Sequence, residues 1–217
     1  QGMIEGEIKE LQTTDVANII HRGGTILKTA RSKAFMTNAG MARAYESLKT
    51  HGIEALILIG GDGTIRGAVE FFKQYDIPSM AIPGTIDNDL AGTDFTIGFD
   101  TAVHTATEAI DKIRDTAEAH DRFFLVEVMG RDAGYIALNS GIACGAESIF
   151  IPEQQESLSA FIAGVQDDQR RKKLTHIIVV AEGDEFGGAQ ELSERIKSAI
   201  PELEIRVCIL GHIQRGG

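Results

Sequence analysis

The sequence contains only two cysteines among its 217 residues, Cys144 and Cys208, and they stand far apart in separate hydrophobic stretches. No Cys-x-x-Cys pair and no Cys/His spacing typical of a zinc site occurs. We therefore expect both residues to be buried structural thiols rather than redox or catalytic groups. These absences leave open a metal ion that is held by carboxylates.

Positive charge and long apolar runs are also scarce. The chain has 21 Lys and Arg against 32 Asp and Glu, which argues against a nucleic acid or an anionic membrane surface as the main partner. No apolar run approaches the roughly 20 residues that span a bilayer, and no charged-then-apolar leader opens the sequence. We interpret the protein as cytoplasmic. Its length and its 43% hydrophobic residues suffice for one large or two small domains.

Short apolar runs alternate with longer amphipathic segments, a pattern typical of β-α units and a largely parallel sheet. The chain is therefore predicted to be α/β. The predicted strands are 55–59, 79–82, 123–128, 148–151, 176–181 and 206–210. The predicted helices are 41–50, 65–74, 101–116, 133–143, 158–170 and 189–199.

A glycine-rich turn follows the first predicted strand, in the run Leu56-Ile57-Leu58-Ile59-Gly60-Gly61-Asp62-Gly63-Thr64. Glycines let backbone N–H groups approach a polyphosphate, and the N-terminus of the following helix adds partial positive charge. Asp62 is suited to hold Mg²⁺. The alternative is a plain β-α turn in which Thr64 caps the helix.

Two carboxylates follow the next predicted strand, in the run Pro83-Gly84-Thr85-Ile86-Asp87-Asn88-Asp89. Open α/β sheets bind ligands at the carboxyl ends of parallel strands. One carboxylate is suited to accept a proton from a hydroxyl, and the other is suited to bind a metal ion. Phosphoryl transfer requires both functions. A solvated Asx-rich turn is the alternative. Because both turns would open on the same edge of the sheet, we favour a shared phosphate-handling site over coincidence.

Cationic residues complete the candidate site, because several guanidinium groups must converge to neutralise a sugar phosphate and a charged transition state. The candidates are Arg31, Arg122, Arg131, Arg206, His212 and Arg215. Arg131 directly follows a predicted buried strand, and His212 and Arg215 follow the last one. Glu182 also ends a strand, where it would either accept hydrogen bonds from sugar hydroxyls or serve as a capping or loop carboxylate.

The sequence resembles the bacterial ATP-dependent 6-phosphofructokinase family over nearly its whole length. The stretches that carry the resemblance are Arg22-Gly23-Gly24-Thr25 with Ala30-Arg31, the two turns above, Val128-Met129-Gly130-Arg131, Ala181-Glu182-Gly183, and Leu210-Gly211-His212-Ile213-Gln214-Arg215-Gly216-Gly217. The resemblance implies a three-layer α/β/α fold with largely parallel sheets in two similar domains, both partial. It assigns residues 1–98 to part of the ATP-binding domain, 99–211 to the fructose 6-phosphate-binding domain and 212–217 to the return toward the first domain.

The implied activity is transfer of a phosphoryl group from ATP, with Mg²⁺, to the 1-hydroxyl of fructose 6-phosphate. By resemblance, Asp87 is the general base, Asp62 holds Mg²⁺ with help from Asp89, and Arg131 and Arg31 stabilise charge on the transferred group. The implied nucleotide-binding residues are Arg31, Gly61, Asp62, Gly63 and Thr64. The implied sugar-phosphate-binding residues are Thr85, Asp87, Arg122, Met129, Gly130, Arg131, Glu182, Arg206, His212 and Arg215. In the family, the residues matching Arg122 and Arg206 come from a neighbouring subunit, so a site at a subunit interface is expected.

The resemblance also predicts a homotetramer and an effector site for ADP or phosphoenolpyruvate at Arg114, Glu147, Arg171 and Lys173; a set of solvated charges is the alternative. Gly63 and Gly84 favour ATP as donor, since pyrophosphate-dependent members tend to carry Asp and Lys there. The family's N-terminal glycine loop, which cradles the ATP phosphates, has no match in this chain. The segment that follows the last glycines in the family has none either. We therefore expect a fragment that is inactive by itself.

Other functions remain to be weighed. NAD kinases and diacylglycerol kinases share a Gly-Gly-Asp-Gly-Thr turn, but they lack the Met-Gly-Arg turn and the His-Ile-Gln-Arg-Gly-Gly run. A related kinase that uses pyrophosphate or another acceptor is a second alternative. A non-catalytic regulatory subunit of the same fold is a third, although retention of Asp62, Asp87 and Arg131 argues against it.

Overall fold

The computed structural model describes residues 1–120, 122–155, 157–171 and 176–216. The chain forms two compact units. The first unit comprises Gln1–Thr85 and Leu90–Thr93, and the second comprises Ile86–Asp89 and Asp94–Gly217. Both are α/β units built on parallel strands, as the alternation of apolar and amphipathic segments predicts.

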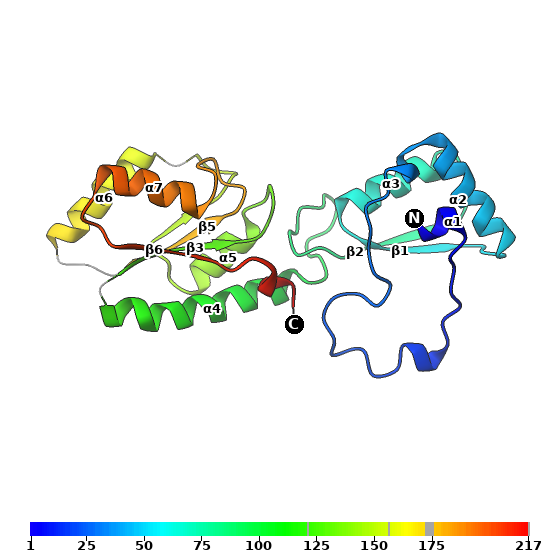
Figure 1. The fold of residues 1–217 in the computed structure, drawn as a ribbon, viewed down its shortest axis with the longest axis horizontal. Helices are drawn as coiled ribbons and strands as arrows, with labels where there is room; N and C mark the ends of the chain where they lie inside the picture. The colour runs from blue at the N-terminus through cyan, green and yellow to red at the C-terminus, as the bar shows by residue number, and fades with distance from the viewer. Residues whose placement is uncertain (121, 156, 172–175, 217) are drawn as a thin grey trace. The chain divides into compact units, whose positions relative to one another are not determined.

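The first unit is built on two parallel strands, β1 (Leu56–Gly60) and β2 (Ser79–Pro83), which pair from Leu56 with Ser79 to Gly60 with Pro83. Its helices are α1 (Gly2–Glu5), α2 (Asn38–Thr50) and α3 (Asp62–Phe72), with 3-10 turns η1 (Thr13–Asp15) and η2 (Ala34–Met36). Figure 1 shows α2 and α3 on one side of the two strands. Phe71 is the largest buried side chain of this small core, which also holds Met41 and Leu48.

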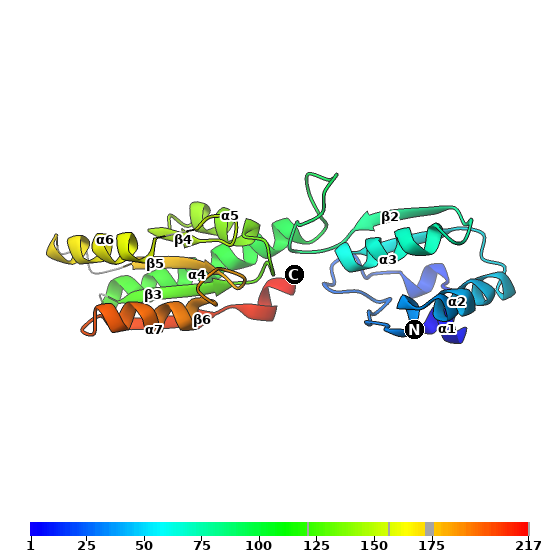
Figure 2. The same ribbon diagram turned by 90° about the horizontal axis from the view of Figure 1, so that it is seen from above.

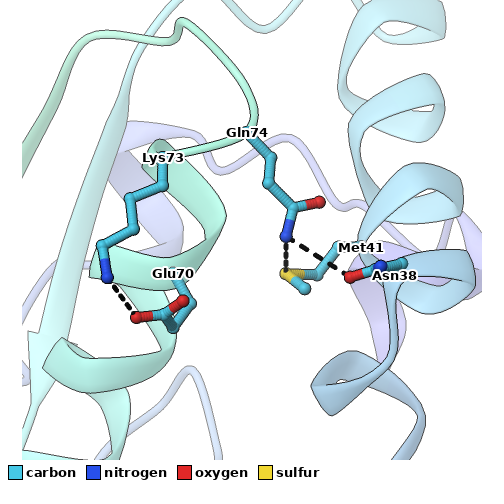
Figure 3. Close-up of polar contacts among 5 residues, drawn as sticks. All are labelled: Asn38, Met41, Glu70, Lys73 and Gln74. Atoms are coloured by element: carbon cyan, nitrogen blue, oxygen red, sulfur yellow. Dashed lines mark hydrogen bonds and ion pairs between the residues drawn. The ribbon is translucent and has the colours of Figure 1, made fainter.

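Contacts at the ends of α2 and α3 fix these helices against each other. The Thr37 hydroxyl accepts a hydrogen bond from the Gly40 N–H, which caps α2. Gln74, just beyond α3, donates its amide to Asn38 Oδ1 at 3.4 Å and contacts Met41 Sδ at 4.0 Å (Figure 3). The start of α2 is therefore joined to the end of α3.

The second unit is built on a four-stranded parallel sheet in the order β4-β5-β3-β6, which Figure 2 shows side by side. Its strands are β3 (Phe123–Val128), β4 (Ser148–Phe150), β5 (His176–Ala181) and β6 (Ile205–Ile209). Its helices are α4 (Phe99–His120), α5 (Tyr135–Ala143), α6 (Leu158–Arg170) and α7 (Ala189–Ala199), followed by the 3-10 helix η3 (Gly211–Arg215). Strands β3 and β4 are consecutive in the sequence but not neighbours in the sheet, and the same is true of β5 and β6. The chain therefore crosses over the sheet between them, as connections between parallel strands do.

Helices cover both faces of this sheet. Figure 1 shows α4 on one face and α6 and α7 on the other. One core packs Ala106 and Ile110 of α4 against Val126, and the opposite core packs Leu192 and Ile196 of α7 against Leu125. All six residues of β5 are buried, which explains why its sequence is a continuous apolar run after His176 rather than an alternating one. The second unit is therefore the three-layer α/β/α arrangement that was predicted.

Every predicted strand and helix is present, with shifts of a few residues at the ends. The helix predicted at 101–116 begins at Phe99 and continues to His120. The helix predicted from Ala133 begins at Tyr135, because the Ala133 N–H donates to the Gly130 carbonyl and closes a turn first. The short helix α1 and the 3-10 helices were not predicted; each is too short to show a periodic apolar pattern.

The two cysteines are free and partly buried, in agreement with the expectation of structural thiols. Burial raises the pKa of the Cys144 thiol, although the nearby Arg114 guanidinium opposes the effect. Burial alone raises the pKa of the Cys208 thiol. Both groups are therefore poor nucleophiles at neutral pH. Within the described ranges, no helix combines the length and the apolar character needed to cross a membrane.

Candidate active site

The glycine-rich turn joins β1 directly to α3. Gly61 is the N-cap and Asp62 the first helical residue, so Thr64 lies inside the first turn and the alternative, in which Thr64 caps the helix, is wrong. The Thr64 N–H donates to the Gly61 carbonyl at 3.0 Å. A Cβ at Gly60 would lie 2.5 Å from Thr64 Oγ1, so this close approach of strand and helix requires glycine.

Gly63 differs from Gly60 because nothing in the local packing requires it. A Cβ at Gly63 would meet no atom within 4 Å, and its φ lies outside the left-handed region. The space beside the first turn of α3 is therefore open. The helix N-terminus beside it carries partial positive charge, which suits a phosphate group.

Asp62 is the one carboxylate of this turn, and its side chain is about one-third exposed at 32%. The Arg66 Nε–H, one helical turn later, donates to Asp62 Oδ1 at 2.7 Å. In the part of the chain that the structure describes, no three His, Cys, Asp or Glu side chains gather in a group that could hold a metal ion. Mg²⁺ in nucleotide sites is commonly held by one or two carboxylates together with phosphate oxygens, so Asp62 fits such a ligand but does not form a closed metal cage.

The second predicted turn begins beside the first. The Gly84 N–H donates to the Gly60 carbonyl at 3.0 Å, and a Cβ at Gly61 would lie 3.2 Å from Thr85 Cβ. The parallel register therefore brings the two turns to the same edge of the β1–β2 sheet, as predicted, at least as far as Thr85.

The carboxylates Asp87 and Asp89 follow Thr85 and belong to the second unit, whereas Asp62 belongs to the first. Asn88 between them has a left-handed φ of 54°. Its Oδ1 accepts a hydrogen bond from Thr96 Oγ1 at 3.1 Å, and its Nδ2 donates to the Asp94 carbonyl at 3.3 Å. Asn88 thus fixes the backbone from which both carboxylates project.

A tight cluster forms at the carboxyl ends of β3 and β5 in the second unit. Glu182 Oε1 accepts hydrogen bonds from the backbone N–H groups of Arg131 at 2.8 Å and Gly130 at 3.4 Å. Arg131 has a left-handed φ of 57°, and a Cβ at Gly183 would lie 1.9 Å from the Arg131 carbonyl oxygen. Glu182 therefore anchors the backbone of the Met129–Arg131 turn, from which the exposed Arg131 side chain projects.

The last predicted segment meets the same turn through Gln214. Gln214 is 1% exposed, and its Oε1 accepts a hydrogen bond from the Met129 N–H at 2.8 Å. The neighbouring side chains of His212 and Arg215 are exposed. The structure thus joins Met129, Gly130, Arg131 and Glu182 to the segment that carries His212 and Arg215. Gln214 was not among the predicted site residues. Its position between His212 and Arg215 was the only sequence feature that could have suggested a role at the site.

Arg122 and Arg206 lie at the other end of the strands, where β3 and β6 begin. Arg122 precedes β3, and Arg206 is the second residue of β6. Both contact Glu204 Oε1, from Arg122 Nε at 3.1 Å and from Arg206 Nη2 at 2.5 Å. The six residues of β3 separate this pair from the Met129–Arg131 turn, a span of about 20 Å at ~3.3 Å per residue. One copy of the second unit therefore does not gather the whole predicted sugar-phosphate set.

The remaining predicted residues occupy separate places. Arg31 lies in an irregular segment of the first unit with an exposed side chain. Arg114 Nη2 donates to the Cys144 carbonyl at 2.7 Å and to the Gly145 carbonyl at 3.2 Å, at the end of α5. Glu147 Oε2 accepts from the Ile177 N–H at 2.8 Å, and Arg171 pairs with Asp167 at 2.6 Å. Lys173 lies outside the described residues.

Parallel strands that end in glycine-rich turns, with a carboxylate at a helix N-terminus and an arginine-bearing turn, define an α/β protein suited to phosphate ligands. The sequence profile of the family described as Phosphofructokinase matches residues 1–217. The chain belongs to the phosphofructokinase family.

Named relatives agree with this membership. The chain is 52% identical over 217 residues to "ATP-dependent 6-phosphofructokinase 2" of Bacteroides thetaiotaomicron and 56% identical over 216 residues to "ATP-dependent 6-phosphofructokinase 1" of Thermus thermophilus. In both matches the whole chain is covered, and it spans 67% of the relative's own length. The fold is similar to the phosphofructokinase of Pichia pastoris in the T-state, with a TM-score of 0.88 and 36% identity over 100% of this chain and 26% of that one.

Proposed function

We propose that the full-length protein carries out the reaction named for its relatives, the ATP-dependent phosphorylation of fructose 6-phosphate to fructose 1,6-bisphosphate in glycolysis, and that these 217 residues alone are inactive. The observation that carries the proposal is the identity of 52% and 56% to two proteins of that name over the full chain. The chemistry of the residues agrees, because the first unit offers an open helix N-terminus for phosphate and the second offers arginine-bearing turns. A cytoplasmic location fits a glycolytic enzyme.

Asp87 is the general base in this proposal, and it accepts the proton of the 1-hydroxyl. Asp62, assisted by Asp89, holds Mg²⁺, and the bound ion supplies neutralisation of charge on the phosphates of ATP. Arg131 and Arg31 stabilise the charge that develops on the transferred phosphoryl group. The left-handed backbone at Arg131, held by Glu182, supports this role because it fixes the direction in which the side chain leaves the turn.

ATP rather than pyrophosphate is the proposed donor. The open space at Gly63 supports this, since glycine there is required neither by backbone strain nor by packing against the protein. An aspartate at this position would extend into the space that we assign to the nucleotide. The nucleotide-binding set is Arg31, Gly61, Asp62, Gly63 and Thr64.

We further propose that two copies of the chain share each sugar-phosphate site. Met129, Gly130, Arg131, Glu182, His212 and Arg215 lie near the carboxyl ends of the strands, whereas Arg122 and Arg206 lie where β3 and β6 begin. Thr85 and Asp87 complete the set. A neighbouring copy that presents its own arginine pair would bring the two groups together. A homotetramer is the proposed assembly, and sedimentation of the full-length protein tests it.

Regulation is proposed at Arg114, Glu147, Arg171 and Lys173, as a site for ADP or phosphoenolpyruvate. Arg114 uses one of its three guanidinium nitrogens, Nη2, on backbone carbonyls at the end of α5, so N–H donors of the same guanidinium remain for an anion. Arg171 pairs with Asp167 at an exposed position, and such pairs are weak enough to exchange for a ligand.

The test of the proposed reaction is a coupled assay for fructose 1,6-bisphosphate with the full-length protein. Asp87→Ser should lower kcat by roughly 10²- to 10⁴-fold, the loss typical of a removed general base. Binding of fructose 6-phosphate and thermal stability should change little. An unchanged kcat would contradict the role of Asp87, and a wild-type protein without turnover would favour a regulatory subunit of the same fold.

A further inference from the structure

Arg122 and Arg206, which lie where β3 and β6 begin, both contact a third residue that the proposed function does not use. Glu204 Oε1 contacts Arg122 Nε at 3.1 Å and Arg206 Nη2 at 2.5 Å. Because both nitrogens contact the same oxygen atom, the two guanidinium groups are neighbours. We propose that Glu204 is a positioning residue that holds Arg122 and Arg206 together as a preformed site for a phosphate dianion.

The backbone explains why the carboxylate lies between the arginines. Strands β3 and β6 are parallel neighbours, with Phe123 opposite Ile205 and Phe124 opposite Arg206. Glu204 and Arg122 are the residues that immediately precede these strands, and the Phe123 N–H donates to the Glu204 carbonyl at 3.3 Å. The strand register therefore fixes Glu204 next to both arginines.

Arg122 depends most on this carboxylate. Its Nε atom is buried from solvent, although the side chain as a whole is 28% exposed, and it has no hydrogen bond of good geometry among the described residues. The Glu204 carboxylate at 3.1 Å is the charge that compensates it. Without this charge, the buried Nε would lose its compensation and the Arg122 side chain would turn toward water.

Both arginines retain N–H donors that can bind a ligand. Each guanidinium has five N–H donors in a planar fork, and the contacts with Glu204 use only one nitrogen of each arginine. Two guanidinium groups and one carboxylate carry a net charge of +1, which still attracts a phosphate dianion. Glu204 also reduces the repulsion between the two cations when no ligand is bound. Its own exposure of 54% implies a moderate rather than a large effect.

The inference rests on the proposed function in that the phosphate is taken to be the 6-phosphate of fructose 6-phosphate. The test uses the assembled full-length protein with Glu204→Gln, which removes the charge, and Glu204→Asp, which keeps it. Glu202→Gln is the matched control, because Glu202 is an exposed acidic residue in the same turn. Circular dichroism and thermal unfolding establish that each variant is folded.

We expect Glu204→Gln to raise the KM for fructose 6-phosphate by about 3- to 10-fold, as for loss of an ion pair of moderate strength. The KM for ATP and kcat should be unchanged, and Glu204→Asp should recover part of the affinity. A KM for fructose 6-phosphate that is unchanged or lower in a folded Glu204→Gln variant would overturn the inference, as would an equal effect of Glu202→Gln.

Calorimetric titration with inorganic phosphate separates this inference from the proposed function. If the wild-type protein fails to phosphorylate fructose 6-phosphate, the proposed reaction is wrong. Weaker phosphate binding by Glu204→Gln, with normal binding by Glu202→Gln, would then still support an anion site organised by Glu204. Equal phosphate binding by all variants would overturn it.

Discussion

Gln214 and Met129 are joined by a hydrogen bond of 2.8 Å from the Met129 N–H to the buried Gln214 Oε1. The two residues are 85 positions apart in the sequence, so this bond links segments that come together only in the folded second unit. On one side of it lies the turn that carries Arg131, and on the other the segment that carries His212 and Arg215. The bond therefore sets the spacing of side chains that we assign to one substrate.

Replacing Gln214 should damage both stability and substrate affinity. Gln214→Leu keeps most of the volume but leaves the Met129 N–H without its acceptor, which costs about 1–3 kcal/mol of unfolding free energy. The KM for fructose 6-phosphate should rise more than the KM for ATP. Urea denaturation and steady-state kinetics measure the two effects. Gln190→Leu on the exposed face of α7 is the control, and equal losses in both variants would contradict this prediction.

Gly183 should tolerate no side chain. In Gly183→Ala the new Cβ would lie 1.9 Å from the Arg131 carbonyl oxygen, so the backbone of one turn must move. We expect a loss of stability and at least a tenfold fall in kcat/KM, about 1.4 kcal/mol or more in transition-state stabilisation. Gly164→Ala in α6 is the matched control, since its Cβ would meet no atom within 4 Å. That variant should be as stable as the wild type, or up to ~1 kcal/mol more stable.

Substitutions at Gly63 should weaken ATP binding without lowering stability. Gly63→Ala adds a Cβ where no protein atom lies within 4 Å, in the first turn of a helix, so the melting temperature should be unchanged or slightly higher. If the nucleotide occupies this space, the KM for ATP should rise several-fold and Gly63→Asp should raise it further. The KM for fructose 6-phosphate serves as the internal control. An unchanged KM for ATP in Gly63→Asp would argue against a nucleotide at this turn.

The two cysteines predict a loss of stability at alkaline pH. Burial raises the pKa of Cys144 and Cys208 above the ordinary value of 9.0, so the folded state binds the thiol protons more tightly than the unfolded state. Their contribution to stability is fully present below pH 9 and is lost as the pH rises through the folded-state values. Unfolding measured in urea from pH 7 to pH 10 should show this fall, and the Cys144→Ala, Cys208→Ala double variant should show a smaller one.

Local sequence predicted most of this architecture. The run of apolar residues in β5 predicts a strand, and the periodic apolar positions of α4 and α7 predict helices. Neither prediction needs knowledge of the segments against which these elements pack. The alternation of these elements then favours parallel strands, whose carboxyl ends share an edge. That is why the turns after β1 and β2 could be predicted to lie side by side.

Roles that depend on register could not be predicted in the same way. Glu204 is one of 32 acidic residues, and only the pairing of β3 with β6 shows that it lies between Arg122 and Arg206. The alternative of a Thr64 cap rested on the preference of N-caps for side-chain oxygens, whereas the strand runs directly into the helix here and Gly61 is the N-cap. Glu182 was expected to accept hydrogen bonds from sugar hydroxyls or to serve as a capping or loop carboxylate. Its bonds to the backbone of Gly130 and Arg131 could not be predicted, because they depend on a contact 51 residues away.

The placement of the Arg122–Arg206 pair at the edge remote from Glu182 has a genetic consequence. If each sugar-phosphate site draws on two copies, an alteration at one edge harms the neighbour's site rather than its own. A copy without Arg206 and a copy without its Glu182 anchor would each be defective alone. Mixed in one assembly, they would create some sites with both defects and some with neither, so two inactive alleles would complement each other when expressed together.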